Sequence, residues 1–197
     1  MHRTNHRWAA AAAAAVATLL LTAGCTQDAP TAEPSTSPTI ADSASPSPAP
    51  STVIAPPTRP AALDDDGPAG AEAAVIYFLA LDSYIQSTGD TAAFEAMSHA
   101  TCDYCAQRLA QAKEIAASHY IWRGGEATVQ INHTYTQDAA TGIWPIDITV
   151  DQASSTLSNG DGVVVTEVPR ERMAVRAEVA RSAGKWVFVE LADIPAG

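Results

Sequence analysis

The most closely spaced reactive side chains of the sequence are the thiols of Cys102 and Cys105. Outside the cytoplasm such a pair is normally oxidised, so the spacing predicts a disulfide. A redox role is an alternative, because a thiol at a helix N-terminus has a lowered pKa, but a helix rather than a strand is expected before this pair. A zinc site with His99 and His119 is a second alternative, although structural zinc sites usually use two close pairs of ligands.

A second set of chemically capable residues lies on two expected strands. His133 falls on the apolar side of its strand, and Asp147 and Asp151 share one side of the next strand. In a curved sheet, His133 and either carboxylate can meet as a general acid and base. The alternative is that His133 is a core residue and that the two carboxylates are solvated.

Aromatic residues form a third set, which can line a binding pocket or simply pack in the core. The predicted pocket consists of Tyr77, Tyr84, His133, Trp144 and Trp186, and Trp122 belongs to the same aromatic set. The sequence contains no G-x-S-x-G, H-E-x-x-H or glycine-rich phosphate-binding motif. We therefore predict no catalytic residues, no metal and no cofactor.

The elements that position these residues fall into two halves. Apolar residues recur at helical spacing over residues 73–85, and Gly89 provides a stop. A short helix carrying Phe94 and Met97 follows, and a third helix starts after Thr101, with Leu109, Ala112, Ile115 and Ala116 on its apolar side. Gly124 and Gly125 are expected to end this half.

From residue 126 the apolar period changes from helical spacing to two. Alternation predicts strands over residues 128–136, 144–151 and 172–181, and another strand over 163–168 follows a turn at residues 158–162. Residues 186–191 are apolar on both sides, which favours a central strand. Helices followed by antiparallel strands indicate an α+β domain, with N-terminal helices packed on a curved, cone-like antiparallel sheet.

The charge balance excludes one class of partner. The chain has 197 residues with 11 Lys and Arg against 22 Asp and Glu, a formal net charge of −11. Binding to nucleic acid depends on clustered basic residues that displace counterions from phosphates. No such cluster is present, so we predict no nucleic-acid partner.

The N-terminus has the features of an export signal. A short basic start precedes fourteen residues, 8–21, of which only Thr18 is polar. This stretch is too short to span a bilayer comfortably. Residues 20–25 resemble a bacterial lipobox, although Thr22 stands where Leu is commonest, so residues 1–24 are predicted to be a lipoprotein signal peptide and Cys25 to be lipidated. An ordinary signal peptide cut near Ala23 is the alternative.

A tether is expected between the anchor and the folded body. Residues 26–68 contain ten of the 13 prolines, together with many Ser, Thr and Ala. Such a composition buries too little apolar surface to offset chain entropy, so residues 25–68 are predicted to be disordered. Residues 69–197 are predicted to form the globular α+β domain.

Two resemblances add to this prediction. The order of three helices and an antiparallel sheet resembles the nuclear transport factor 2-like cone. Residues 71–126 are similar to an uncharacterised family of actinobacterial lipoproteins, at Tyr77, residues 88–91, residues 97–98, the Cys102 and Cys105 pair and residues 124–125. This resemblance implies a surface lipoprotein of unknown role and supplies no catalytic residues, and the cone fold serves enzymes, binding modules and structural domains alike.

The leading hypothesis is a lipid-anchored protein on the outer face of the cell membrane that acts as a non-catalytic binding or interaction module. Its expected partners are the membrane, through Cys25, and an unidentified envelope protein or small molecule. One alternative is a small cone-fold enzyme that uses His133 with Asp147 or Asp151. Another is a structural accessory subunit without a ligand.

Overall fold

The computed structural model describes residues 54–196, and the predicted signal peptide, Cys25 and residues 26–53 of the predicted tether lie outside them. A 3-10 turn, η1 (Ala61–Asp64), precedes the helices α1 (Pro68–Thr88), α2 (Ala92–Met97) and α3 (Asp103–Ala117). All three helices were predicted from the sequence. On α3 the apolar side is narrower than expected, because Ala112 and Ile115 are buried whereas Ala116 is exposed.

Helix α1 begins at a proline and ends before a glycine, and each residue type is favoured at that position. Pro68 occupies the first turn, where its missing N–H has no intrahelical partner in any case. Gly89 ends the helix in the left-handed region, with φ of 72°, and its N–H donates to the carbonyl oxygen of Ile85. Residues with a Cβ rarely adopt this φ, which explains why a glycine ends the helix there.

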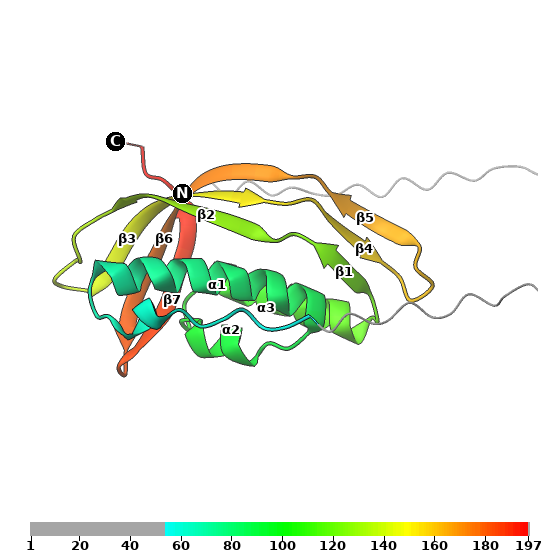
Figure 1. Ribbon diagram of the computed structural model, residues 1–197, viewed down its shortest axis with the longest axis horizontal. Coiled ribbons are helices and arrows are strands. Elements are labelled where there is room, and N and C mark those ends of the chain that lie inside the picture. The colour runs from blue at the N-terminus through cyan, green and yellow to red at the C-terminus, as the bar shows by residue number, and fades with distance from the viewer. Residues whose placement is uncertain (1–53, 197) are drawn as a thin grey trace, which may run out of the picture. The chain divides into compact units, whose positions relative to one another are not determined.

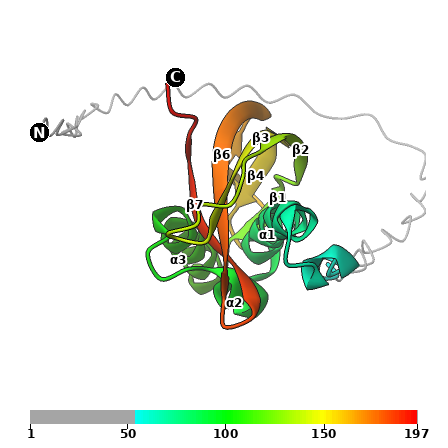
Figure 2. The ribbon, with the colours of Figure 1, turned by 90° about the vertical axis from the view of Figure 1, so that its left-hand side faces the viewer.

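Seven strands form two antiparallel sheets. The strands are β1 (Ile121–Gly124), β2 (Ala127–Thr134), β3 (Ile143–Gln152), β4 (Ser155–Ser158), β5 (Val164–Val168), β6 (Glu171–Ser182) and β7 (Lys185–Asp193). The strand order is β1-β4-β5 in one sheet and β2-β3-β6-β7 in the other. The helices lie against one side of the strands (Figures 1 and 2), which confirms the α+β class with N-terminal helices on a curved antiparallel sheet.

The two sheets are joined at a bend that the sequence did not predict. Gly124 and Gly125 were expected to end the helical half, but both have a positive φ and connect β1 to β2. A Cβ on Gly124 would lie 2.4 Å from the carbonyl oxygen of Ser154, so the close approach of two backbones requires glycine here. Strands β1 and β4, of four residues each, are too short to show a clear alternation.

Strand β7 is an edge strand, and the prediction that residues 186–191 form a central strand is wrong. It hydrogen-bonds only to β6 within its sheet. On one side of β7 Trp186 and Phe188 are buried, whereas Val187 on the other side is half-buried. The free edge is covered at Phe188: Ser98 forms an isolated bridge with Phe188, and the N–H of His99 donates to the Phe188 carbonyl oxygen at 2.9 Å. An edge that is covered in this way needs no charged residues to prevent pairing with other chains.

The centre of the core is a stack of three phenylalanine rings. Phe78 of α1 lies between Phe188 of β7, at 4.1 Å between centroids, and Phe94 of α2, at 4.4 Å. All three side chains are fully buried, and they are the only phenylalanines of the chain. The stacked rings therefore connect helices α1 and α2 to strand β7 of the sheet.

The folded part begins earlier than the predicted boundary between residues 68 and 69. Leu63 of η1 is buried in the core, and the indole Nε1 of Trp186 donates to the carbonyl oxygen of Asp65 at 3.1 Å. One aliphatic side chain and one backbone hydrogen bond thus fix a segment whose composition alone indicates a tether. Among residues 54–196, no helix is long and apolar enough to cross a membrane.

The contact between η1 and α1 yields a prediction for Gly70→Ala. A Cβ at this position would lie 1.9 Å from the carbonyl oxygen of Asp65 and 3.0 Å from Trp186. We expect this clash to lower the free energy of unfolding by about 1–3 kcal/mol, measured by urea denaturation. Helix propensity alone favours Ala over Gly by about 1 kcal/mol, so a more stable variant would contradict the close packing of η1.

Candidate functional site

A concave site lies where η1, α1, α2 and the β6–β7 hairpin meet. It has a volume of about 380 Å³. We call it the η1 groove and define it by its lining residues: Arg59, Leu63, Asp64, Tyr77, Ala93, Ala96, Met97, Arg181, Gly184, Lys185 and Trp186. A volume of this size falls at the lower end of the range for small-molecule sites.

The η1 groove concentrates positive charge in an acidic protein. Arg59, Arg181 and Lys185 line it against a single carboxylate, that of Asp64. Arg59 donates to Asp64 at 2.7 Å, and this hydrogen bond holds the pKa of the Asp64 carboxyl below its usual value. Arg181 pairs with Asp66 at 2.7 Å, and its guanidinium carbon lies 5.3 Å from the centre of the Trp186 ring. The groove thus combines cations with an aromatic wall.

The structure separates the five residues of the predicted pocket. Tyr77 and Trp186 both line the η1 groove. The hydroxyl of Tyr84 donates to Asp90 near the end of α1, and Trp144 packs half-buried against the core. His133 is exposed on β2. The basic residues of the groove were not predicted, because they come from two segments far apart in the chain, residue 59 and the β6–β7 hairpin.

His133 and Asp147 lie opposite each other on neighbouring strands. They are register partners of β2 and β3, next to a bulge between Ile131 and His133. The bulge shifts His133 out of the alternation that predicted an apolar surrounding, so its side chain is exposed and packs edge-on against the Tyr135 ring at 4.3 Å.

The Asp147 carboxylate is held by other residues than His133. Arg176 donates to both of its oxygens, at 2.7 and 3.1 Å, and the hydroxyl of Tyr135 donates to Oδ2 at 2.9 Å. The hydrogen bonds from Arg176 lower the pKa of Asp147 below its ordinary value of 3.8, against the opposing effect of burial. Asp151 is paired in the same manner with Arg170. Both carboxylates thus join β3 to residues in or next to β6, and among residues 54–196 no hydrogen bond links His133 to either.

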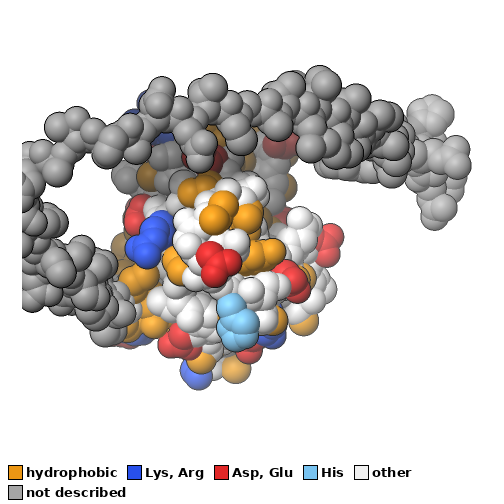
Figure 3. Space-filling view, turned by 90° about the vertical axis from the view of Figure 1, so that its right-hand side faces the viewer, with side chains coloured by type: hydrophobic (Ala, Val, Ile, Leu, Met, Phe, Trp, Pro, Cys, Tyr) orange, Lys and Arg blue, Asp and Glu red, His pale blue; other side chains and the backbone are white. Residues whose placement is uncertain are grey.

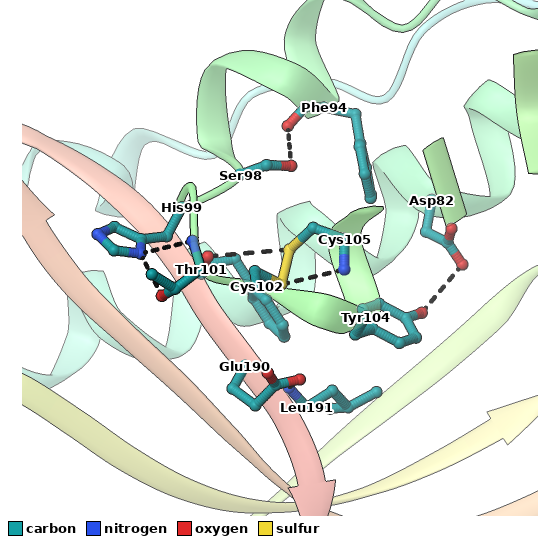
Figure 4. Close-up of a disulfide and its surroundings, with 11 residues drawn as sticks. Asp82, Phe94, Ser98, His99, Thr101, Cys102, Tyr104, Cys105, Glu190 and Leu191 are labelled. Atoms are coloured by element: carbon teal, nitrogen blue, oxygen red, sulfur yellow. Dashed lines mark hydrogen bonds between the residues drawn. A yellow bond between two sulfur atoms is a disulfide. The ribbon is translucent and has the colours of Figure 1, made fainter. Parts of the chain in front are cut away.

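Cys102 and Cys105 form a disulfide at the start of α3 (Figure 4). Cys102 is the N-cap residue, and its sulfur accepts a hydrogen bond from the N–H of Cys105 at 3.0 Å. Both residues are buried beside β7. Within the described part of the chain, no three His, Cys, Asp or Glu side chains are grouped as a metal site would require.

A largely buried polar network joins α1 to α3. Asp82 of α1 accepts from Arg108 Nε at 2.7 Å and from the hydroxyl of Tyr104 at 3.1 Å (Figure 4 shows the second bond). Burial and the Asp82 charge raise the pKa of Tyr104 well above its ordinary value of 10. The cavity beside these residues is only about 100 Å³, too small for most organic ligands. A single charged residue in the middle of an apolar helix, as Asp82 is, was the signal in the sequence that could have located this network.

An exposed apolar patch lies at the far end of the three-stranded sheet. Val163, Val164 and Val165 are 59%, 48% and 50% exposed, and Tyr120 and Ile121 at the start of β1 are each 38% exposed. Figure 3 faces this end of the molecule and shows hydrophobic side chains gathered on it. Strand β5 is an open edge of its sheet, with every residue exposed. Such an edge is prone to pairing with other chains.

Comparisons with known proteins identify a family but no activity. A family model described as a family of unknown function (DUF6318) matches residues 44–192. The match confirms the prediction of an uncharacterised family in this coarser form. Among curated proteins, none matches the chain.

Similar solved structures include the intermembrane space region of the chloroplast protein ARC6. It has a TM-score of 0.52 and 15% identity, over 66% of this chain and 98% of that one, and the similarity concerns the fold alone. Aln2 from a Streptomyces species has a TM-score of 0.37 and 16% identity, over 62% and 88% of the two chains. A putative calcium/calmodulin dependent protein kinase II association domain from Xanthomonas campestris has a TM-score of 0.35 and 13% identity, over 74% and 100%. Neither of these two supports an inference.

The ion pair of Asp147 yields a prediction for the pH dependence of stability. Because the pKa of Asp147 is lowered in the folded state, its contribution is complete above its ordinary value of 3.8 and is lost as the pH falls through the folded-state value. We expect the free energy of unfolding to fall below about pH 4, and Asp147→Asn to be less stable at pH 7 with a smaller fall. Urea unfolding from pH 7 to pH 3 measures this. The exposed Asp161→Asn is the control, and an equal fall in both variants would contradict the assignment.

The open edge of β5 yields a second prediction. We expect Val164→Lys to raise the temperature at which the protein aggregates, measured by light scattering, and to leave its unfolding midpoint nearly unchanged. Ile194→Lys is the matched control, since it makes the same charge change at another exposed aliphatic residue. Both substitutions reduce the net negative charge, so a general charge effect would act alike on both. Equal aggregation of the two variants would argue against β5.

Proposed function

The chain belongs to the family of unknown function DUF6318, which assigns it no activity, and we propose that it is a lipid-anchored, non-catalytic binding module on the outer face of a cell membrane. The anchor is Cys25, at the end of the lipobox-like residues 20–25. One acyl chain gives only reversible membrane binding, whereas a diacylated cysteine holds a protein stably. Residues 26–53 then separate the folded domain from the membrane.

The observation that carries the binding role is the η1 groove. Its lining residues are basic, aromatic, small and aliphatic, a combination suited to holding a ligand rather than to reacting with one. It includes no Ser, Thr, Cys or His, and its one carboxylate, that of Asp64, is paired with Arg59. The phenylalanine stack fills the space between α1, α2 and β7, and the cavity beside Asp82 and Tyr104 measures about 100 Å³, too small for most organic ligands.

The position of the groove suits a tethered module. Arg59, Leu63 and Asp64 line it, and they lie within the last residues before α1. The groove is therefore built partly from the segment through which the tether enters the domain. A ligand bound there contacts both the tether end and the β6–β7 hairpin, so binding should stabilise their mutual contact.

The anchoring part of the proposal is tested with Cys25→Ser. In a bacterium with a lipoprotein pathway, the unaltered protein should sediment with membranes, and its intact mass should include a diacylglyceryl group on Cys25. Cys25→Ser should abolish that mass and release most of the protein from the membrane fraction.

The control for that experiment is the double variant Cys102→Ser, Cys105→Ser. It makes the same chemical change in the folded body and leaves no unpaired thiol there. This variant should still be lipidated and sediment with membranes. An unmodified, freely soluble protein from the unaltered sequence would overturn the anchoring proposal.

A further inference from the structure

We propose that the ligand of the η1 groove is a small organic anion whose charge is attached to a flat apolar body. This inference rests on the proposed binding function and specifies the chemistry of its ligand. It follows from the distribution of the basic residues and from the walls of the groove.

The basic residues show where an anion can be held. Nine Lys and Arg follow residue 24, and all nine lie within residues 54–196. Six of them form ion pairs with carboxylates: Arg59, Arg108, Lys113, Arg170, Arg176 and Arg181. Within the described residues, the other three, Arg123, Arg172 and Lys185, lie beyond 4.0 Å of any carboxylate oxygen. Of these three, only Lys185 lines the η1 groove.

The groove is positive even after its own acidic residues are counted. Its three cations face Asp64 alone among the lining residues, and Asp66 pairs with Arg181 from outside the lining. One net positive charge therefore remains, at Lys185, in a protein whose net charge after removal of residues 1–24 is −13. An anion is repelled by most of this surface and attracted at the groove.

The walls determine what must be attached to the anion. Tyr77 and Met97 are half-buried and provide aromatic and aliphatic surface, whereas Trp186 and Leu63 also line the groove but are almost fully buried. Ala93 and Ala96, three residues apart on α2, leave room above this surface. A purely inorganic anion would leave these walls without a partner, whereas a flat ring with a carboxylate or sulfonate would contact both the walls and Lys185.

Two fluorescent probes with similar rings test the inference on the full mature chain. Anilinonaphthalene sulfonate is an anion, and phenylnaphthylamine is its uncharged counterpart without the sulfonate. We expect the anionic probe to bind at least about tenfold more tightly. Lys185→Glu should remove this preference, and the matched charge reversal Arg123→Glu, on β1, should leave it intact.

A third variant tests whether the probe occupies the groove. Ala93 is exposed on α2, so Ala93→Trp should fill the groove without disturbing the core and should abolish the binding of both probes. The unfolding midpoint of each variant shows that the domain remains folded. Inorganic phosphate at the same concentration should displace the anionic probe only weakly.

The outcomes separate this inference from the proposed function. Equal binding of both probes, lost in Ala93→Trp, would overturn the anion preference and leave the binding role in place. Binding of neither probe, or binding unaffected by Ala93→Trp, would count against the groove as a binding site and so against both proposals.

A peptide of residues 26–53 has three acidic residues and no basic one. Displacement of the anionic probe by this peptide would reassign the groove to the chain's own segment and overturn the inference.

Discussion

The stacking of Phe78 between Phe94 and Phe188 is the contact on which the rest of the domain depends. It joins α1, α2 and the edge strand β7 through rings that are fully buried. Because interiors pack to near-crystalline density, three rings at this position leave little free volume beneath the sheet. None of the three rings lines the η1 groove, which lies where η1, α1, α2 and the β6–β7 hairpin meet.

Trp186 connects this core to the chain that precedes α1. It follows the tight turn of β6 and β7, and its indole both donates to the Asp65 carbonyl and forms a wall of the η1 groove. Gly70 allows Asp65 to approach α1 closely enough for this hydrogen bond. The same residue thus fixes the entry of the chain into the domain and shapes the candidate site, so the two are structurally coupled.

The sequence predicted the elements whose signals are long and local. Helix α1, with its 3.6-residue period and Gly89, and strand β6, with its strict alternation, lie where they were expected. Features that depend on distant contacts were not predictable. Leu63, for example, is buried because it packs in the core formed by residues far along the chain. The candidate site was predictable only in part for the same reason. Trp186 stands out as an aromatic residue, but the cations beside it come from distant segments, so no spacing along the chain relates Arg59 to Lys185.

The ion pairs on the outer side of the sheet explain why the groove, rather than the His133 region, is the better candidate. The prediction that His133 lies on the apolar side of its strand is wrong, because one β-bulge inverts the alternation of the strand from that point onward. Both oxygens of Asp147 accept hydrogen bonds from Arg176, and one also accepts from Tyr135. A carboxylate held in this way connects neighbouring strands and is not positioned to orient the His133 imidazole. To act with His133 as a catalytic pair, Asp147 would have to give up these hydrogen bonds while remaining mostly buried, which is unfavourable. Lys185 has no such partner among residues 54–196 and lies beside aromatic surface, so a ligand can meet its charge without breaking an existing contact.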